Sequence, residues 1–217
     1  MKLFLVNIIF LFLRGILMLL GLMVFGCTHE PPPPLSKQQQ EEKMHLEHAN
    51  LADNLAHRDI IILDEQIRPP REFGQVFSTF FGSYLRLGEA LVKMDTQTID
   101  KAAEQLKFVL ELIPGLVKGD TAINTWKSHR ERYLKNVMEF LQSQNLEEKR
   151  VYYSYISEIL YCTLKSFRME IGDIHMAYCP TSFDNKGGYW LTDSHKIRNP
   201  YAGNEQPKCG SIVEIIQ

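Results

Sequence analysis

Residues 73–94 read FGQVFSTFFGSYLRLGEALVKM, and the spacing of their large apolar side chains indicates the architecture of the chain. These side chains recur every three or four positions, a period that gathers them on one face of an α-helix. The stretch therefore predicts a helix over about 73–94, whose apolar face carries Phe73, Val76, Phe77, Phe80, Tyr84, Leu87, Leu91 and Met94.

The same period predicts three further helices. Asp95-Thr96 offers capping side chains for a second helix, and Pro114-Gly115 ends it because proline lacks the amide hydrogen that a helix needs. Asp120 is predicted to cap a third helix, and a fourth covers about 147–167. The apolar positions expected on these helices are Ile99, Ala102, Ala103, Leu106, Val109, Leu110 and Ile113, then Trp126, Tyr133, Val137, Phe140 and Leu141, then Val151, Tyr155, Ile159, Cys162 and Leu164.

The predicted fold class is mainly α: an antiparallel four-helix bundle with a C-terminal loop-rich segment containing short β-strands. Strands are expected at 174–179, 189–191 and 212–216, with a turn at 184–188. Cys162 is expected to be a small buried core residue and not a reactive thiol.

The first 26 residues have the features of an export signal. Lys2 and Arg14 give a positive start, and the apolar run 16–25 ends directly before Gly26-Cys27. We therefore expect 1–26 to be a signal peptide and Cys27 to be acylated, as the boundary resembles that of bacterial lipoproteins. The alternative is an uncleaved anchor, since a stretch of this length can span a bilayer. Both interpretations predict a cell-envelope protein attached to the membrane and facing the periplasm or the outer surface.

A tether is expected between this leader and the folded domain. Residues 27–70 are predicted to be a lipid-anchored tether and linker, with a stiff polyproline spacer at 31–34 and a polar helix or stalk at 36–57. Residues 60–63 are apolar and are predicted to dock onto the domain, which is expected over 71–217.

The composition excludes several classes of protein. The chain has 217 residues, of which 45% are hydrophobic and 23% charged, values that argue against wholesale disorder. Its formal net charge is −2, so it lacks the basic face that phosphate neutralisation requires, and no nucleic-acid partner is expected. Four cysteines are too few for a disulfide-built scaffold, so a hydrophobic core must hold the fold.

The C-terminal segments resemble those of an uncharacterised family of exported domains. Cys179-Pro180, DNKGGYWL at 184–191, IRNPYAG at 197–203 and Lys208-Cys209-Gly210 are similar to the family segments C-P-M-A, N-K-G-A-x-W-L, I-x-N-P-Y-x-G and M-L-x-C-G. Members occur alone or appended to periplasmic adaptor subunits of copper and silver efflux pumps. The resemblance implies soft-metal handling, with an efflux adaptor or another envelope protein as partner. The matching residues are Pro180, Asn185, Lys186, Gly187, Trp190, Asn199, Pro200, Tyr201, Gly203 and Gly210.

The chain departs from this pattern at two methionines. Thr181 stands where the family has Met after Cys-Pro, and Gln206-Pro207 replaces Met-Leu, so two of the thioether donors that Cu(I) favours are lost. Three interpretations of the last two cysteines remain open: a disulfide, a two-thiolate copper or silver site completed by His175 or Met176, or two unpaired thiols. On a strand, His175 and Cys179 would share one face about 13 Å apart, at ~3.3 Å per residue. The candidate metal ligands are Cys179, Cys209, His175 and Met176, with His195 as a further donor.

No catalytic motif is present in the sequence. It contains no C-x-x-C pair, G-x-S-x-G elbow, H-E-x-x-H helix or phosphate-cradling glycine loop, so we expect no enzymatic activity. The expected function is that of a non-catalytic envelope lipoprotein that binds soft metal or assists efflux. The alternative is a structural or protein-interaction domain that keeps a Cys179–Cys209 disulfide and no metal. Its aromatic residues would form a contact surface or fill the space between tail and bundle: Tyr178, Tyr189, Trp190 and Tyr201.

Overall fold

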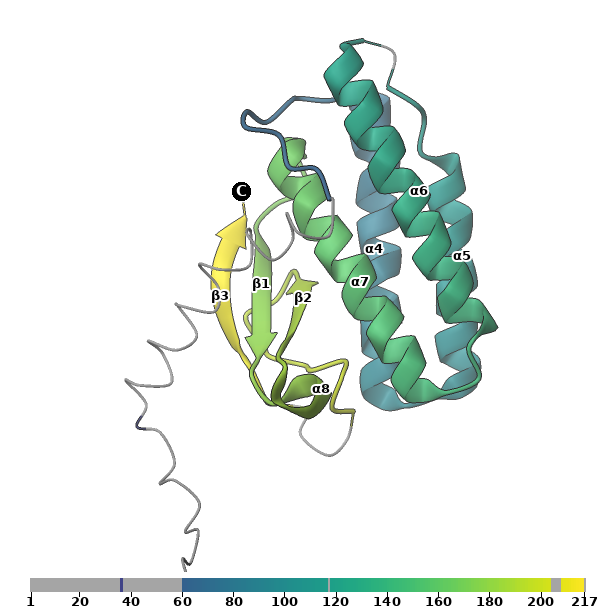
Figure 1. The fold of residues 1–217 in the computed structure, drawn as a ribbon, viewed down its shortest axis with the longest axis vertical. Coiled ribbons are helices and arrows are strands. Elements are labelled where there is room, and N and C mark those ends of the chain that lie inside the picture. The colour runs from purple at the N-terminus through teal and green to yellow at the C-terminus, as the bar shows by residue number, and fades with distance from the viewer. Residues whose placement is uncertain (1–35, 37–59, 117, 204–207, 217) are drawn as a thin grey trace, which may run out of the picture. The chain divides into compact units, whose positions relative to one another are not determined.

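The computed structural model of the protein describes Ser36 and residues 60–116, 118–203 and 208–216 (Figure 1). The predicted signal peptide, Cys27 and the tether before residue 60, apart from Ser36, lie outside the described residues. Within the described ranges, no helix combines the length and apolar character needed to cross a membrane.

Four long helices form the body of the domain. They are α4 (Arg71–Lys93), α5 (Thr96–Leu112), α6 (Asp120–Gln142) and α7 (Leu146–Ser166), and they lie side by side with alternating direction (Figure 1). The turns α4–α5 and α6–α7 are each a few residues long, which makes the joined helices antiparallel neighbours. The predicted mainly helical fold with a four-helix bundle is confirmed.

The helix termini show why these boundaries were predictable and where one prediction was wrong. Asp95 caps α5 by accepting a hydrogen bond from the Thr98 amide, and Asn145 caps α7 through the Glu147 amide. Asp120 does not cap α6, because Gly119 with φ 78° takes the cap position and Asp120 is the first residue inside the helix. Its carboxylate still complements the positive end of the helix dipole.

Aromatic side chains dominate the interior of the bundle. Phe73 packs edge-on against Trp126 with ring centroids 4.8 Å apart, and Phe80 meets Tyr133 in the same way at 5.2 Å. Cys162 is fully buried among them, as predicted. Three residues of the predicted apolar faces are not in the core: Met94 is 40% exposed at the cap of α4, Tyr155 is 38% exposed on α7, and Val151 is only half-buried.

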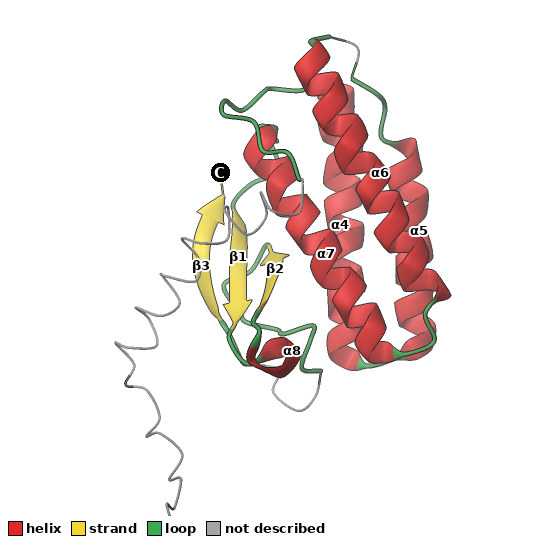
Figure 2. Ribbon diagram, viewed as in Figure 1, coloured by secondary structure: helices red, strands yellow, loops and turns green. Residues whose placement is uncertain are grey.

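A small antiparallel sheet lies beside α7 and holds the C-terminal residues (Figure 2). It consists of β1 (Ile174–Cys179), β2 (Gly188–Thr192) and β3 (Ser211–Ile216) in the order β2-β1-β3. The three predicted strands are therefore confirmed. The predicted turn before β2 contains a single short helical turn, α8 (Ser182–Asn185), in which Phe183 and Asp184 have left-handed backbone angles.

Hydrogen bonds tie the sheet to the bundle. The Leu191 amide of β2 donates to the Tyr84 hydroxyl of α4 over 3.0 Å, and that hydroxyl lies 2.7 Å from Ser157 Oγ of α7. The ring of Tyr84 stacks on Tyr153 with centroids 4.8 Å apart. The described residues from β1 onward, called the tail below, thus share a buried layer of aromatic side chains with α4 and α7.

The residues before α4 also pack on the domain. Ile60 is buried, the Leu63 amide donates to Ser166 Oγ over 3.1 Å, and Ile67 exchanges backbone hydrogen bonds with Ser166 and Arg168 at the end of α7. The predicted docking of residues 60–63 is confirmed.

Candidate functional site

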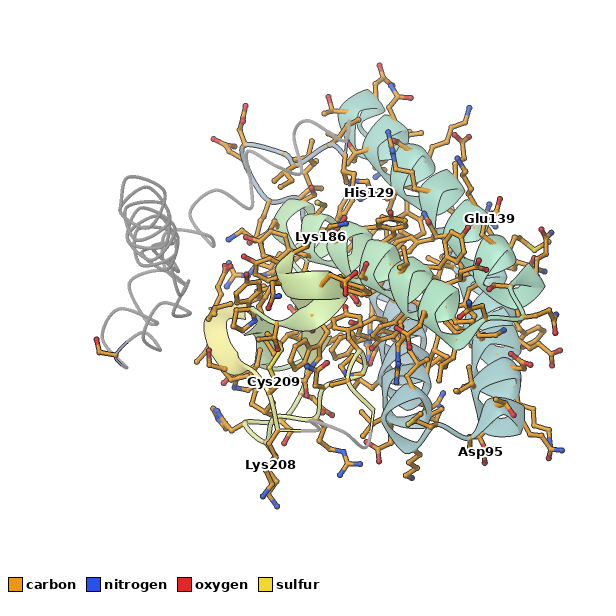
Figure 3. All side chains as sticks on the ribbon, turned by 60° about the horizontal axis from the view of Figure 1, so that its bottom comes forward. Asp95, His129, Glu139, Lys186, Lys208 and Cys209 are labelled. Carbon is orange, nitrogen blue, oxygen red and sulfur yellow. A yellow bond between two sulfur atoms is a disulfide. The ribbon has the colours of Figure 1, made fainter. Side chains whose placement is uncertain are left out.

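Cys179 and Cys209 form a disulfide at the end of the sheet where β1 finishes and β3 begins. The antiparallel register pairs Tyr178 with Ser211, so Cys179, the next residue of β1, lies near Cys209, which stands two residues before β3. Their Cα atoms are 5.7 Å apart across a sequence separation of 30, a distance that suits a disulfide. Of the three interpretations left open by the sequence, the structure shows the covalent pair, and Figure 3 labels Cys209 beside the strands.

Thr181 lies directly over this disulfide. Its hydroxyl oxygen is 3.3 Å from Cys179 Sγ and 3.3 Å from Cys209 Sγ. Disulfide sulfurs have no hydrogen to donate, so the threonine hydroxyl is the donor to one sulfur at a time. Thr181 therefore covers the disulfide with a polar group.

Asn199 holds the returning tail against the disulfide. Its side chain is fully buried, its Oδ1 accepts from the Tyr201 amide over 2.8 Å, and its Nδ2 donates to the Cys209 carbonyl over 3.2 Å. Pro200 between them is also buried. These contacts give a structural reason for the asparagine-proline-tyrosine segment that the sequence singled out.

Tyr201 joins the tail to the bundle. Its hydroxyl donates to the Tyr189 carbonyl, and its ring contacts Trp190 edge-on at 5.9 Å and Tyr153 at 6.1 Å between centroids. Burial raises the pKa of Tyr201, so the hydroxyl stays protonated. Trp190 and Tyr201 are buried and fill the space between tail and bundle, whereas Tyr178 is buried against the half-buried Tyr189 within the tail.

Gly210 follows the disulfide at a position that has room for no side chain. Its φ is 128°, and a Cβ there would lie 2.7 Å from Trp190 Cη2 and 2.9 Å from the Tyr178 carbonyl oxygen. The chain must approach the sheet this closely for Cys209 to reach Cys179. The other motif residues, Pro180, Asn185, Lys186 and Gly187, lie in the connection from β1 through α8 to β2.

The remaining candidate ligands, His175 and Met176, are neighbours on β1. Both are buried, and the His175 ring lies 4.1 Å from that of His195 between centroids, with its Nδ1 buried and without a hydrogen-bond partner. Side chains alternate along a strand, so Met176 faces away from Cys179. Across the described ranges, no group of three or more His, Cys, Asp or Glu side chains could hold a metal ion.

The third cysteine with a described position lies outside the disulfide. Cys162 is a free thiol within the bundle, and burial raises its pKa to about 12. The thiolate is the reactive form, so this thiol neither binds metal nor attacks a substrate at neutral pH.

Two charged residues at the start of α7 were not singled out from the sequence. Lys149 and Arg150 are both buried, although they follow two glutamates in a polar stretch that indicates a solvated helix end. Lys149 Nζ bonds to Asp100 Oδ1 over 2.8 Å and to the Phe140 carbonyl over 3.1 Å. Arg150 pairs with Glu147 through Nη1. The partners that bury Lys149 are distant in sequence, so no local pattern could have identified it.

Comparison with known proteins finds a family model that matches part of the chain. The family described as "Protein of unknown function (DUF3347)" matches residues 80–172, from within α4 to just after α7. The match ends before β1, so the C-terminal motifs lie outside it. No curated protein and no solved structure matches the chain. The expectation of a domain of uncharacterised function is thereby supported, and the association with efflux adaptors stays a prediction.

Proposed function

We propose that the protein is a non-catalytic, lipid-anchored module of the cell envelope, in which a disulfide-clamped helical domain serves as a structural or protein-interaction unit. The observation that carries the proposal is the Cys179–Cys209 disulfide. Disulfides persist in oxidising compartments and are rare in the cytosol, where thiols are kept reduced. Together with the leader of 1–26 and Cys27, this favours export to a compartment outside the cytoplasm.

Counting thiols on the full chain, expressed with its own leader and denatured, tests the proposal. If Cys27 is acylated, Cys162 alone reacts before reduction and three thiols react after it, because reduction frees Cys179 and Cys209. An uncleaved anchor would leave Cys27 free and raise both counts by one. Equal counts before and after reduction would refute the disulfide.

The lipid anchor has its own test. Cells that express the full chain are labelled with a fatty-acid analogue, and the protein is expected to carry the label and to sediment with membranes. Cys27→Ser should abolish labelling, because the acyl chains that give stable attachment are expected on that cysteine. Cys162→Ser is the matched control and should keep the label. Labelling that survives in the Cys27→Ser variant would refute lipidation at this residue.

A second candidate function, copper or silver binding, rests on the adjacency of the two sulfurs. The oxidised pair offers no thiolate, so the site would exist only in the reduced protein. After reduction, two thiolates close together suit Cu(I), which favours soft sulfur ligands. Of the two further candidate ligands, His175 has an unpartnered nitrogen but lies four residues from Cys179 along β1, and Met176 faces the other way.

Metal uptake by the reduced full chain distinguishes the two functions. Titration with Cu(I), and with Ag(I) as a redox-inert substitute, is expected to load one ion per chain if the second function holds. Cys209→Ser should abolish this uptake, and Cys162→Ser should preserve it because that thiol is buried with a raised pKa. No uptake by reduced protein would leave the interaction module as the function.

A further inference from the structure

A cleft of about 780 Å³ opens beside the disulfide, between the start of α7, the end of α4 and the residues around α8. Its size lies within the range of sites that bind small molecules. Both polar and apolar side chains line it. The apolar walls are Met94, Val151, Phe183 and Tyr201, and the polar lining includes Arg150 and Ser182.

Arg150 lines this cleft, and two of its three guanidinium nitrogens have no hydrogen-bond partner. The residue is 5% exposed, and only its Nη1 has a partner, Glu147. Its Nε and Nη2 are buried without a hydrogen-bond partner, and the same holds for Ser182 Oγ. Leaving charged donors buried and unpaired is costly, and the ammonium of neighbouring Lys149, by contrast, has two hydrogen-bond partners.

The two unpaired nitrogens specify a ligand chemistry. Nε–H and Nη2–H project from one edge of the planar guanidinium, and their spacing matches the two oxygens of a carboxylate. A hydroxyl such as that of Ser182 can add a third bond to the same group. A carboxylate offers each of the two nitrogens its own acceptor oxygen, which a single carbonyl oxygen does not.

The charges around the cleft restrict the ligand further. The lining contains two basic side chains, Arg150 and Lys186, and three acidic ones, Glu147, Glu148 and Asp184, so its formal charge is 2 − 3 = −1. Glu147 already neutralises Arg150, and Glu148 accepts a hydrogen bond from Ser143. Repulsion from this acidic lining grows with the charge of the ligand, so a doubly charged anion such as sulfate is disfavoured relative to a monoanion with an apolar body.

We propose that this cleft binds the carboxylate of an amphiphilic monoanion. Arg150 Nε and Nη2 each donate to one carboxylate oxygen, Ser182 Oγ donates to the same group, and the apolar body lies along Met94 and Phe183. This inference goes beyond the proposed function, since it requires neither the lipid nor a metal. Free carboxylates and the C-terminal carboxylate of an apolar peptide share the required chemistry.

Gly203 allows the guanidinium to occupy this place. With φ 55°, it contacts Arg150 so closely that an added Cβ would lie 2.6 Å from Nη2 and 2.6 Å from Met94 Sδ. Gly203, two residues after the asparagine-proline-tyrosine segment, therefore leaves room for the Arg150 guanidinium in addition to turning the chain.

Binding is measured by calorimetry on the full chain in detergent, against a detergent blank. Hexanoate is the free-carboxylate probe with hexanamide as its neutral control, and N-acetyl-leucine with its amide represents a peptide C-terminus. At least one acid is expected to bind ten-fold or more tightly than its amide, and which acid does so identifies the source. Sulfate should bind more weakly than that acid. Absence of binding by both acids, or equal binding of acid and amide, would overturn the proposal.

Substitution of the arginine assigns the binding to this cleft. Arg150→Gln should weaken acid binding at least ten-fold, and Arg150→Lys should also weaken it because a lysine lacks the bidentate edge. Arg71→Gln is the matched control, since Arg71 is exposed at the opposite end of α4 from Met94. Unchanged binding by a folded Arg150→Gln variant would overturn the proposal.

A measurement on the unsubstituted protein covers the case in which the Arg150→Gln variant does not fold. The protein is labelled with ¹⁵N-arginine, and the Nε–H resonance of Arg150 is assigned by its loss in Arg150→Lys. This resonance is expected to shift when the acid is added and to stay in place when the amide is added. A resonance that stays unmoved at saturating acid would refute contact with Arg150.

Discussion

His129 illustrates how a single buried side chain holds the segment before α4. Its Nε2 lies 2.7 Å from the Ile61 carbonyl oxygen, and its Nδ1 lies 3.1 Å from Thr163 Oγ1. A carbonyl only accepts, so the ring carries a hydrogen on Nε2, and Nδ1 lies against the Thr163 hydroxyl, which itself donates to the Ile159 carbonyl over 2.8 Å. Figure 3 places this residue among the helices, away from the disulfide. Desolvation lowers the pKa of His129 from 6.5 to about 4.

The lowered pKa of His129 predicts a loss of stability in mild acid. Between pH 6.5 and about 4 the unfolded chain binds a proton that the folded protein excludes, so the free energy of unfolding falls as pH falls through this window. The full effect is about 3 kcal/mol, at ~1.4 kcal/mol per pKa unit. Urea unfolding of the wild type and of His129→Gln at pH 7 and at pH 4.5 measures it.

The His129→Gln variant serves as the internal control for other groups that titrate in the same window. It should lose less unfolding free energy than the wild type between the two pH values. Equal losses in the two proteins would show that His129 does not control the pH dependence.

At the scale of one helix, α4 contains two glycines whose replacement should have opposite effects. A Cβ on Gly74 would meet no atom within 4 Å, whereas a Cβ on Gly88 would overlap the hydroxyl of Tyr153. Gly74→Ala is expected to stabilise by about 0.5–1 kcal/mol, since alanine is the better helix former. Gly88→Ala is expected to destabilise by about 1–3 kcal/mol through overpacking.

Thermal unfolding of the two variants, compared at equal pH, tests this pair. Both substitutions add the same methyl group to the same helix, so any difference reports the packing of Tyr153. Two shifts of the same sign would contradict the buried position of that hydroxyl.

The elements themselves were largely predictable, and the errors have local causes. Periodicity identified α4 and α5 because each presents one apolar face to the bundle. On α7 the expected face included Tyr155, which is exposed, whereas Tyr153, Ile156 and Leu160 are buried. This helix contacts both α6 and β2, so its buried residues spread around it and blur the period.

At the scale of the whole molecule, the disulfide is expected to contribute substantially to stability. It joins residues separated by 30 positions, for which the loop-entropy model gives about 3–4 kcal/mol. Reduction should therefore lower the unfolding temperature of the wild type, as measured by circular dichroism with and without reductant. The Cys179→Ala/Cys209→Ala double variant should unfold at the lower temperature in both conditions.

If the reductant lowers the unfolding temperature of the double variant as much as that of the wild type, the reductant acts at a place other than the disulfide. An unchanged unfolding temperature in fully reduced wild type would show that the aromatic contacts of Tyr201 and Trp190 hold the tail without the covalent bond.

Helix number, strand positions and the core role of Cys162 follow from patterns between residues close in the chain, because period and capping depend on neighbours within a few positions. The joining of Cys179 to Cys209 and the bond from Leu191 to Tyr84 depend on partners far apart in sequence, and so does the burial of Arg150 against Gly203. No local pattern contains those contacts, since burial and hydrogen-bond partners are established only when the tail packs on the bundle.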